Sequence, residues 1–134
     1  MKNILITGGA GLVGSVLTKG LKDKFNISIL DIKKVDGVDS HTGDISNIDS
    51  IMPAFKGIDT VVHLAGDRRV HGDWDSILNN NIIGLYNIYE AARLSGVKRV
   101  VFASSQHATG GFYDVEPYSF CLLYTSPSPR DNLP

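Results

Sequence analysis

The apolar residues of this chain fall into short continuous runs separated by amphipathic stretches. The short runs predict strands over residues 2–7, 27–31, 60–65 and 99–104, with a weaker strand near 38–42. Apolar residues at helical spacing predict helices over residues 12–23, 47–56 and 74–95. Strands that alternate with helices are typical of α/β proteins with a parallel, doubly wound sheet, so we expect five parallel strands.

Polar residues and glycines mark the expected ends of these helices. Ser46 or Asn47 can cap the second helix and Asp73 the third, whereas Gly57 and Gly96 can end them. Along the third helix we expect one apolar stripe to cover the sheet, formed by Ile77, Leu78, Ile82, Leu85, Ile88, Tyr89 and Ala92.

A glycine-rich turn, TGGAGLVG at residues 7–14, joins the first strand to the first helix. Gly8 suits a tight turn, Gly11 permits close approach of a pyrophosphate, and Gly14 lets the helix lie against the sheet. Three glycines can also mark a turn without a ligand. The buried strand before the turn and the helix after it favour a dinucleotide site.

The residues around this turn suggest which dinucleotide binds. The N–H groups of the first helical turn, including those of Leu12 and Val13, can face an anion. Asp31 ends the second strand, where its carboxylate can accept hydrogen bonds from both ribose hydroxyls and repel a ribose phosphate. Lys33 and Lys34 can reduce that repulsion. The alternative for Asp31 is an ordinary acidic residue in a turn, without a ligand. We expect NAD rather than NADP.

Composition narrows the class of protein. With 134 residues, 43% of them hydrophobic, and a net charge of -1, the chain has the composition of a globular protein without a basic stripe for nucleic acid or membrane lipid. No apolar stretch is long enough to cross a bilayer and no signal peptide opens the chain, so we expect a cytoplasmic location. The single cysteine and the spacing of the four histidines predict no structural metal.

The pattern of elements ends after Gly111. Residues 121–131, CLLYTSPSPRD, are identical to the translation of a common transposon-type sequencing adapter. We therefore expect an incomplete dinucleotide-binding domain over residues 1–120 and a non-native, disordered tail over 121–134. A genuine Ser-Pro tail is the alternative.

Several motifs together resemble one family. In chain order they are TGGAGLVG, Asp31, Gly43-Asp44-Ile45, His63-Leu64-Ala65-Gly66, Asn81-Ile82-Ile83-Gly84 and Val101-Phe102-Ala103-Ser104-Ser105. Over residues 1 to about 113 the chain resembles the extended short-chain dehydrogenase/reductases, the NAD-dependent epimerase/dehydratase group with a Rossmann-type fold. Within that group, NNIIGLYNIYEAAR and VVFASSQHATGGFY resemble the uronate dehydrogenases. Those enzymes oxidise the anomeric carbon of a hexuronic acid to an aldarolactone and pass the hydride to NAD.

The resemblance implies further cofactor contacts. Asp44 would bond the adenine amino group while Ile45 packs on the ring, and Leu64, Ala65 and Gly66 would carry their backbone beneath the cofactor.

Two polar residues in these motifs allow more than one interpretation. His63 suits a packed residue at a strand end better than a ligand. Asn81 lies on an apolar stripe and needs a partner: the resemblance implies a cofactor-side or active-site asparagine, and the alternative is a hydrogen bond from Asn79, Asn80 or Asn81 to a neighbouring loop.

The resemblance also places the chemistry after the last predicted strand. Ser105 would be catalytic, bonding the substrate oxygen that loses its proton, with Ser104 in support. Gln106 and His107 would touch the sugar or its carboxylate, although the subgroup has Asn where this chain has Gln106 and His107 also suits a loop residue. The exact substrate therefore stays open.

Other expectations concern the loop after the 60–65 strand and the rest of the protein. Arg68 and Arg69 could pair with a carboxylate or remain solvated. No Tyr-x-x-x-Lys pair, the family's general base, occurs in the sequence, so we expect an N-terminal piece without turnover of its own. The resemblance also implies that the protein is a homodimer. The alternatives to a sugar or sugar-acid dehydrogenase are a sugar-nucleotide epimerase or dehydratase and a non-catalytic NAD sensor.

Overall fold

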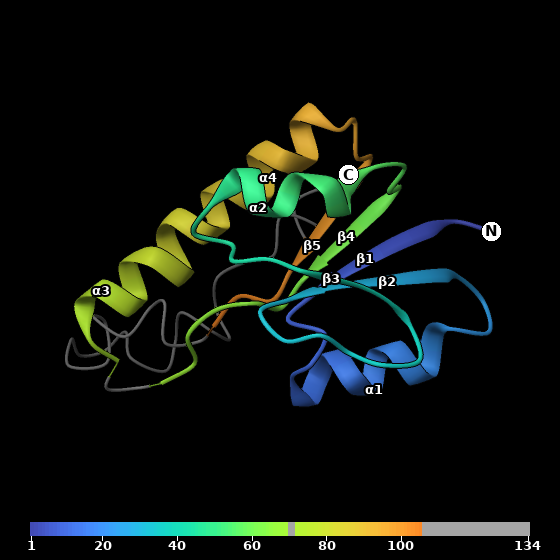
Figure 1. The fold of residues 1–134 in the computed structure, drawn as a ribbon, viewed down its shortest axis with the longest axis horizontal. Coiled ribbons are helices and arrows are strands. Elements are labelled where there is room, and N and C mark those ends of the chain that lie inside the picture. Colours follow the sequence, from blue (N-terminus) through green and yellow to red (C-terminus); the bar gives the residue numbers. More distant parts are fainter. Residues whose placement is uncertain (70–71, 106–134) are drawn as a thin grey trace, which may run out of the picture. The chain divides into compact units, whose positions relative to one another are not determined.

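The computed structural model describes residues 1–69 and 72–105, in which five parallel strands form one sheet (Figure 1). Its order is β3-β2-β1-β4-β5. The strands are β1 (Asn3–Thr7), β2 (Asn26–Asp31), β3 (Asp39–Thr42), β4 (Thr60–His63) and β5 (Arg99–Phe102). The predicted fold class is confirmed, and the sheet belongs to a compact unit that spans Met1–Ala103.

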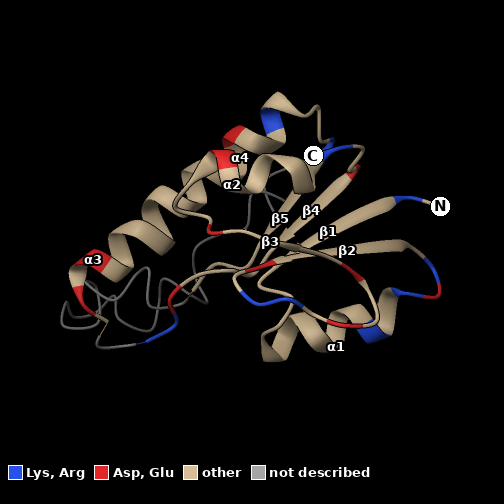
Figure 2. Cartoon of the chain, in the orientation of Figure 1, with Lys and Arg blue, Asp and Glu red and all other residues tan. Residues whose placement is uncertain are grey.

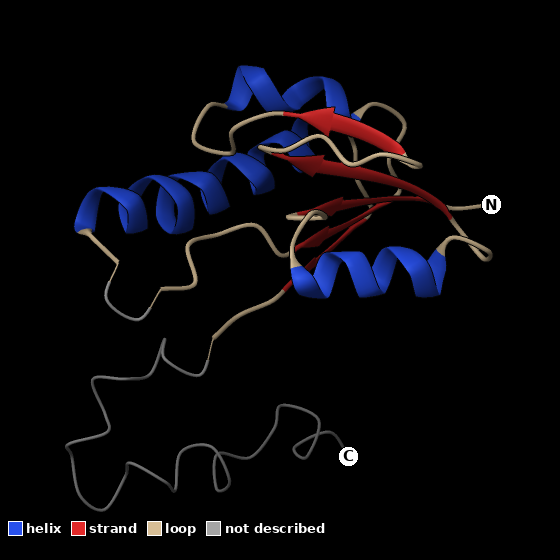
Figure 3. Cartoon of the chain, turned by 60° about the horizontal axis from the view of Figure 1, so that its bottom comes forward, coloured by secondary structure: helices blue, strands red, loops and turns tan. Residues whose placement is uncertain are grey.

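Helices cover both faces of this sheet, as Figure 3 shows, with α1 on one face and the later helices on the other. The helical segments are α1 (Leu12–Leu21), α2 (Ile48–Ile51), the 3-10 turn η1 (Met52–Phe55), α3 (Trp74–Ile77), the π-helical turn η2 (Leu78–Ile83) and α4 (Gly84–Leu94). Asn47 caps α2 and Asp73 caps α3 through their side chains, as predicted.

The two later helices differ from their predicted form. The expected helix over residues 47–56 is a short α-helix that tightens into η1, where Pro53 lies in the first turn and lacks an N–H group. The expected helix over 74–95 contains the π turn η2, in which the N–H of Gly84 donates to the carbonyl of Asn79.

The π turn also explains why the predicted apolar stripe is partly wrong. Ile88 and Ala92 are buried, but Ile82 is 50% exposed and Tyr89 46% exposed. A π-helical turn holds more residues than an α-helical one, so positions that would align along a regular helix rotate out of phase.

The core lies between the sheet and the helices α2, η1 and α4. Leu5, Leu30 and Val61 come from the three central strands and are at most 1% exposed. They pack in one cluster with Phe55 and Ile88. The predicted burial of residues 4–6 is confirmed.

Strand β5 is the last strand of the sheet within the described residues, and Val101 and Phe102 are 48% and 41% exposed. None of the helices in the described part of the chain is both long and apolar enough to cross a bilayer. Over the same residues, His, Cys, Asp and Glu side chains form no group of three or more that could hold a metal ion.

Candidate functional site

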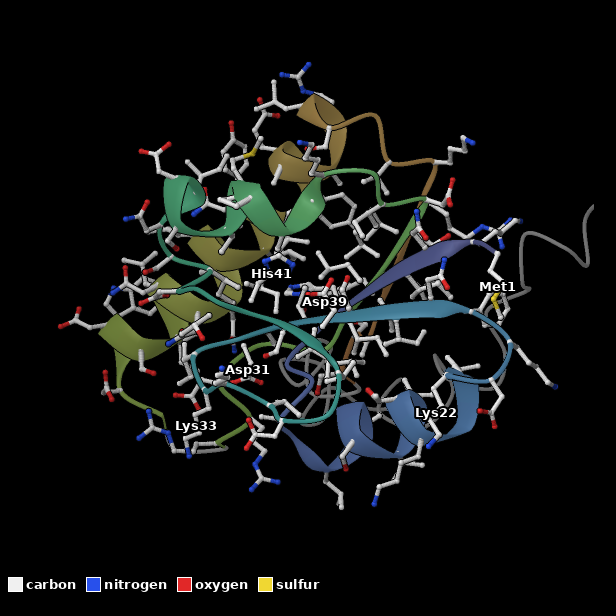
Figure 4. The ribbon with its side chains drawn as sticks, turned by 45° about the vertical axis from the view of Figure 1, so that its right-hand side comes forward. Met1, Lys22, Asp31, Lys33, Asp39 and His41 are labelled. Carbon is white, nitrogen blue, oxygen red and sulfur yellow. The ribbon has the colours of Figure 1, made fainter. Side chains whose placement is uncertain are left out.

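A cavity of about 940 Å³ opens at the carboxyl ends of β1, β2 and β4. In open α/β sheets this edge is where ligands bind. Figure 4 shows Asp31 and Lys33 together at this end of the molecule, away from Met1. The lining residues include Gly8, Gly11, Leu12, Val13, Gly14, Asp31, Lys33, Ile45, Leu64, Ala65, Gly66, Asp67, Arg68, Arg69, Asn80 and Ala103.

Two glycines of the turn stand where no side chain fits. Gly8 has φ +70, and a Cβ there would lie 2.8 Å from the amide nitrogen of Ala65. At Gly14 a Cβ would lie 2.5 Å from the carbonyl oxygen of Gly8, because the helix begins directly against the turn. Both contacts are with backbone, which cannot swing aside. The turn is therefore a cradle of main chain next to the cavity.

The first turn of α1 offers donors to the cavity. Gly11 is its N-cap residue and no side chain caps the helix. The N–H groups of Leu12 and Val13 thus have no acceptor within the helix, and both residues line the cavity. Such a helix end is suited to hold an anion such as a pyrophosphate.

Asp31 is fixed at the β2 end of the cavity. One carboxylate oxygen accepts a hydrogen bond from the N–H of Ala10 at 2.9 Å, and the other from the N–H of Lys33 at 3.1 Å. Each oxygen keeps a lone pair for a further donor, such as a ribose hydroxyl. The arrangement suits the predicted role, which stays a prediction.

Of the two residues predicted to contact adenine, Ile45 lines the cavity and Asp44 does not. Ile45 lines the cavity, although it is only 6% exposed and its carbonyl accepts a hydrogen bond from the Asn87 amide at 2.8 Å. Asp44 is exposed, does not line the cavity, and accepts a hydrogen bond from the N–H of Ser46 at 2.8 Å.

His63 is a packed residue, as predicted. It is 1% exposed, and its ring stacks on that of Phe102 with centroids 5.5 Å apart. The Thr7 hydroxyl accepts hydrogen bonds from the N–H groups of Leu64 and Ala65, and it also shares a hydrogen bond with His63 Nδ1 at 2.7 Å. Burial lowers the pKa of His63 to about 4, so the imidazole is neutral at physiological pH.

Asn81 does not line the cavity but holds the loop that does. Its Oδ1 accepts a hydrogen bond from the N–H of Asp67 at 2.6 Å, and its Nδ2 donates to the Asp67 carbonyl at 2.8 Å. Of the two predicted alternatives, the structure shows the hydrogen bond to a neighbouring loop. Contact between Asn81 and the cofactor stays a prediction.

The same loop carries an ion pair. Arg69 donates through Nε to both carboxylate oxygens of Asp67 at 3.0 Å, and its terminal amino group also contacts Asp67 and the Ser76 hydroxyl. The Ser76 hydroxyl donates to Asp67 at 2.5 Å. These hydrogen bonds, with Arg69 first, hold the pKa of the Asp67 carboxyl well below its usual range. In Figure 2 an acidic and a basic segment adjoin in the loop after β4.

The residues predicted to carry the chemistry follow β5 in sequence. Ser104 and Ser105 are described and exposed, and they begin a second unit of the chain. Gln106, His107 and the tail over 121–134 lie outside the described residues. Sequence reasoning missed the contribution of Thr7, Asp67 and Ser76, whose partners are set by the fold.

Comparison with known proteins identifies the family. The model of the NAD dependent epimerase/dehydratase family matches residues 4–130. The chain belongs to that family. Its cofactor is accordingly NAD, and the glycine cradle, the uncapped α1 and Asp31 fit a dinucleotide of this kind.

Individual relatives are dehydrogenases of sugars. L-arabinose 1-dehydrogenase (NAD(P)(+)) of Haloferax volcanii is 39% identical over 107 residues, which cover 80% of this chain and 42% of the relative. Uronate dehydrogenase of Agrobacterium fabrum is 37% identical over 121 residues, 87% of this chain and 45% of the relative. A mutant uronate dehydrogenase from Agrobacterium tumefaciens, complexed with NAD, superposes with a TM-score of 0.73 at 38% identity, covering 80% and 42%. The chain thus spans less than half the length of these relatives.

Proposed function

We propose that the protein containing this chain is an NAD-dependent oxidoreductase of a sugar or sugar acid, which oxidises the anomeric carbon of a hexuronic acid to an aldarolactone. The observation that carries the proposal is the cavity at the carboxyl edge, with its glycine cradle, in a chain 37% identical to a uronate dehydrogenase. When bound, NAD supplies the hydride acceptor.

In this proposal the described residues bind and orient the cofactor. The N–H groups at the start of α1 hold the pyrophosphate and Asp31 accepts the ribose hydroxyls. Leu64, Ala65 and Gly66 pass beneath the cofactor, where a flat stretch of main chain avoids a clash. Asp44 and Ile45 contact the adenine.

The substrate side of the proposal rests on the residues after β5. Ser105 hydrogen-bonds the hydroxyl that loses its proton, and Ser104, Gln106 and His107 hold the sugar. In this proposal the group that accepts the proton belongs to the full-length protein. We also propose that the full-length protein is a cytoplasmic homodimer.

The test uses the full-length protein with NAD and either glucuronate or galacturonate. We expect NADH absorbance to rise, and no rise with either sugar acid would reject the uronate assignment. Replacing Ser105 by Ala should lower kcat about a hundredfold, as expected for loss of one preorganised donor. Ser95→Ala at the end of α4 is the control and should leave kcat unchanged.

A sugar-nucleotide epimerase or dehydratase is the second candidate, favoured by the family description itself. An epimerase returns the hydride to its product, so NADH would not accumulate, and a new sugar nucleotide would appear by chromatography. A protein that binds NAD and turns over neither class of sugar would instead be a non-catalytic sensor.

A further inference from the structure

Arg68 and Arg69 are neighbours in the loop after β4, but the structure gives them different surroundings. Arg69 is committed to the carboxylate of Asp67 and approaches Asp73 at 3.5 Å. Arg68 is exposed, lines the cavity, and has no hydrogen-bond or ion-pair partner among the described residues. One guanidinium is thus structural and the other is available to a ligand.

The charges that line the cavity leave Arg68 uncompensated. On the β2 side, Lys33 lies close to Asp31 along the chain. On the β4 side, Asp67 is neutralised by Arg69. Because Arg69 already pairs with the carboxylate next to it, Asp67 presents little repulsion to an incoming anion.

Hydrogen bonds also hold the backbone on both sides of Arg68. Asn81 fixes the backbone of Asp67 through two hydrogen bonds, and the N–H of Arg69 donates to the Asp67 carboxylate at 3.0 Å. The residue between them is therefore anchored on each side. An anchored residue loses less backbone entropy when its side chain binds a ligand, which favours a specific contact.

The sheet order assigns Arg68 to one end of the cavity. Strands β2 and β4 lie on opposite sides of β1, so Arg68 and Asp31 follow strands on opposite sides of the glycine turn. A dinucleotide crosses the sheet at this point, with its adenosine at the acidic residue that ends β2. Arg68 then lies toward the reacting end.

We propose that Arg68 is a specificity-determining residue that binds the anionic group of the sugar substrate, a carboxylate or a phosphate, and so selects anionic sugars over neutral ones. The inference rests on the proposed function and names its substrate class. A planar guanidinium can bind either anion through two parallel hydrogen bonds.

The experiment measures steady-state kinetics of the full-length protein carrying Arg68→Gln. The KM for glucuronate should rise about tenfold or more, as expected for loss of a charge-assisted pair, while kcat stays within about twofold. The KM for L-arabinose, a neutral sugar, and the Kd for NAD should not change. Arg68→Lys should give an intermediate KM because an ammonium cannot form the paired contact.

The control is Arg93→Gln, which removes a guanidinium paired with Glu90 on the surface of α4 and should leave every constant unchanged. Parallel assays with glucose 6-phosphate distinguish the two anions: the one whose KM rises in Arg68→Gln is the one that Arg68 binds. Equal changes for glucuronate and L-arabinose, or weaker NAD binding instead, would overturn the inference.

Calorimetric titration separates this inference from the proposed function. If the wild-type protein oxidises no sugar, the proposed function fails, but glucuronate and glucose can still be titrated into the NAD-saturated protein. Tighter binding of glucuronate that Arg68→Gln weakens about tenfold supports the inference. No preference of the wild-type protein for the anion overturns it.

Discussion

The glycine turn and the start of α1 present main-chain groups to the cavity, with the Asp31 carboxylate beside them, whereas the main chain of the loop after β4 is itself held by side chains. No side chain caps α1, and the glycine turn receives one side-chain hydrogen bond, in which the N–H of Ala10 donates to Asp31. The loop after β4 depends on Thr7, Asn81 and Asp67.

The difference separates two ways of building a binding wall. The glycine turn depends on the absence of side chains at Gly8 and Gly14, so added volume should disturb it most. The β4 loop is held by contacts between residues that are 14 and 57 positions apart, so loss of one hydrogen-bonding atom disturbs it. The first wall should respond to size and the second to charge, pH and hydrogen-bonding groups.

The largest effect should come from adding volume to the glycine turn. A side chain at position 14 would meet the backbone of Gly8 and Gly9, so Gly14→Val should weaken NAD binding roughly a hundredfold, equivalent to about 3 kcal/mol of overpacking strain. Gly20→Ala in the same helix is the control, since a Cβ there meets nothing within 4 Å. Equal NAD affinities of the two variants, measured by calorimetry, would refute the size argument.

The pH dependence of stability should come from the β4 side. The pKa of His63 is lowered to about 4, so below pH 6.5 the unfolded chain binds a proton that the folded protein refuses. The free energy of unfolding should be highest above pH 6.5 and fall by about 3 kcal/mol as the pH approaches 4. The His63→Gln variant should lose this dependence, as measured by denaturant titration at several pH values. His41, a partly exposed histidine of β3, provides the control, and the His41→Gln variant should keep the dependence.

A smaller effect should follow from changing one atom of Asn81. Asn81→Asp keeps the acceptor for the Asp67 N–H but removes the donor to the Asp67 carbonyl, which should lower the free energy of unfolding by about 1–2 kcal/mol. NAD affinity should fall with it. Asn79→Asp, at an exposed position of the same π turn, is the control for added charge. If both variants behave alike, Asn81 does not hold the loop.

The smallest effect should come from Asp67→Asn, which weakens the pair between the Asp67 carboxylate and the exposed guanidinium of Arg69. We expect a few-fold loss of NAD affinity and a slight loss of stability. Because the pKa of Asp67 is lowered, its contribution should be constant above the unfolded value of 3.8 and disappear only as pH falls below it. A stability difference between wild type and variant that already declines near pH 6 would contradict this assignment. Asp75→Asn in α3 is the control.

The same contrast explains what could be predicted from sequence. The strand over 2–7, the turn and Asp31 were predictable because their spacing follows from local geometry, and β1 is found at Asn3–Thr7. A hydrogen bond from Asn81 to a neighbouring loop was one of two predicted alternatives, but its partner Asp67 was not predicted, and neither was the bond from Ser76 to Asp67, because both require the loop to return to its helix. The π turn was not predicted either, since the apolar pattern favoured a regular helix over 74–95.

The buried pair of Thr7 and His63 has a consequence for how the sheet assembles. The two residues are register partners of β1 and β4, and both are at most 1% exposed. A slip of β4 by one residue would turn His63 to the opposite face, and a slip by two would move it about 6.6 Å along Thr7's strand. Either error would bury a hydroxyl and an imidazole without each other. The Thr7–His63 pair therefore favours the observed register of β1 and β4, and this register is the one that places the backbone of Leu64 against Gly8.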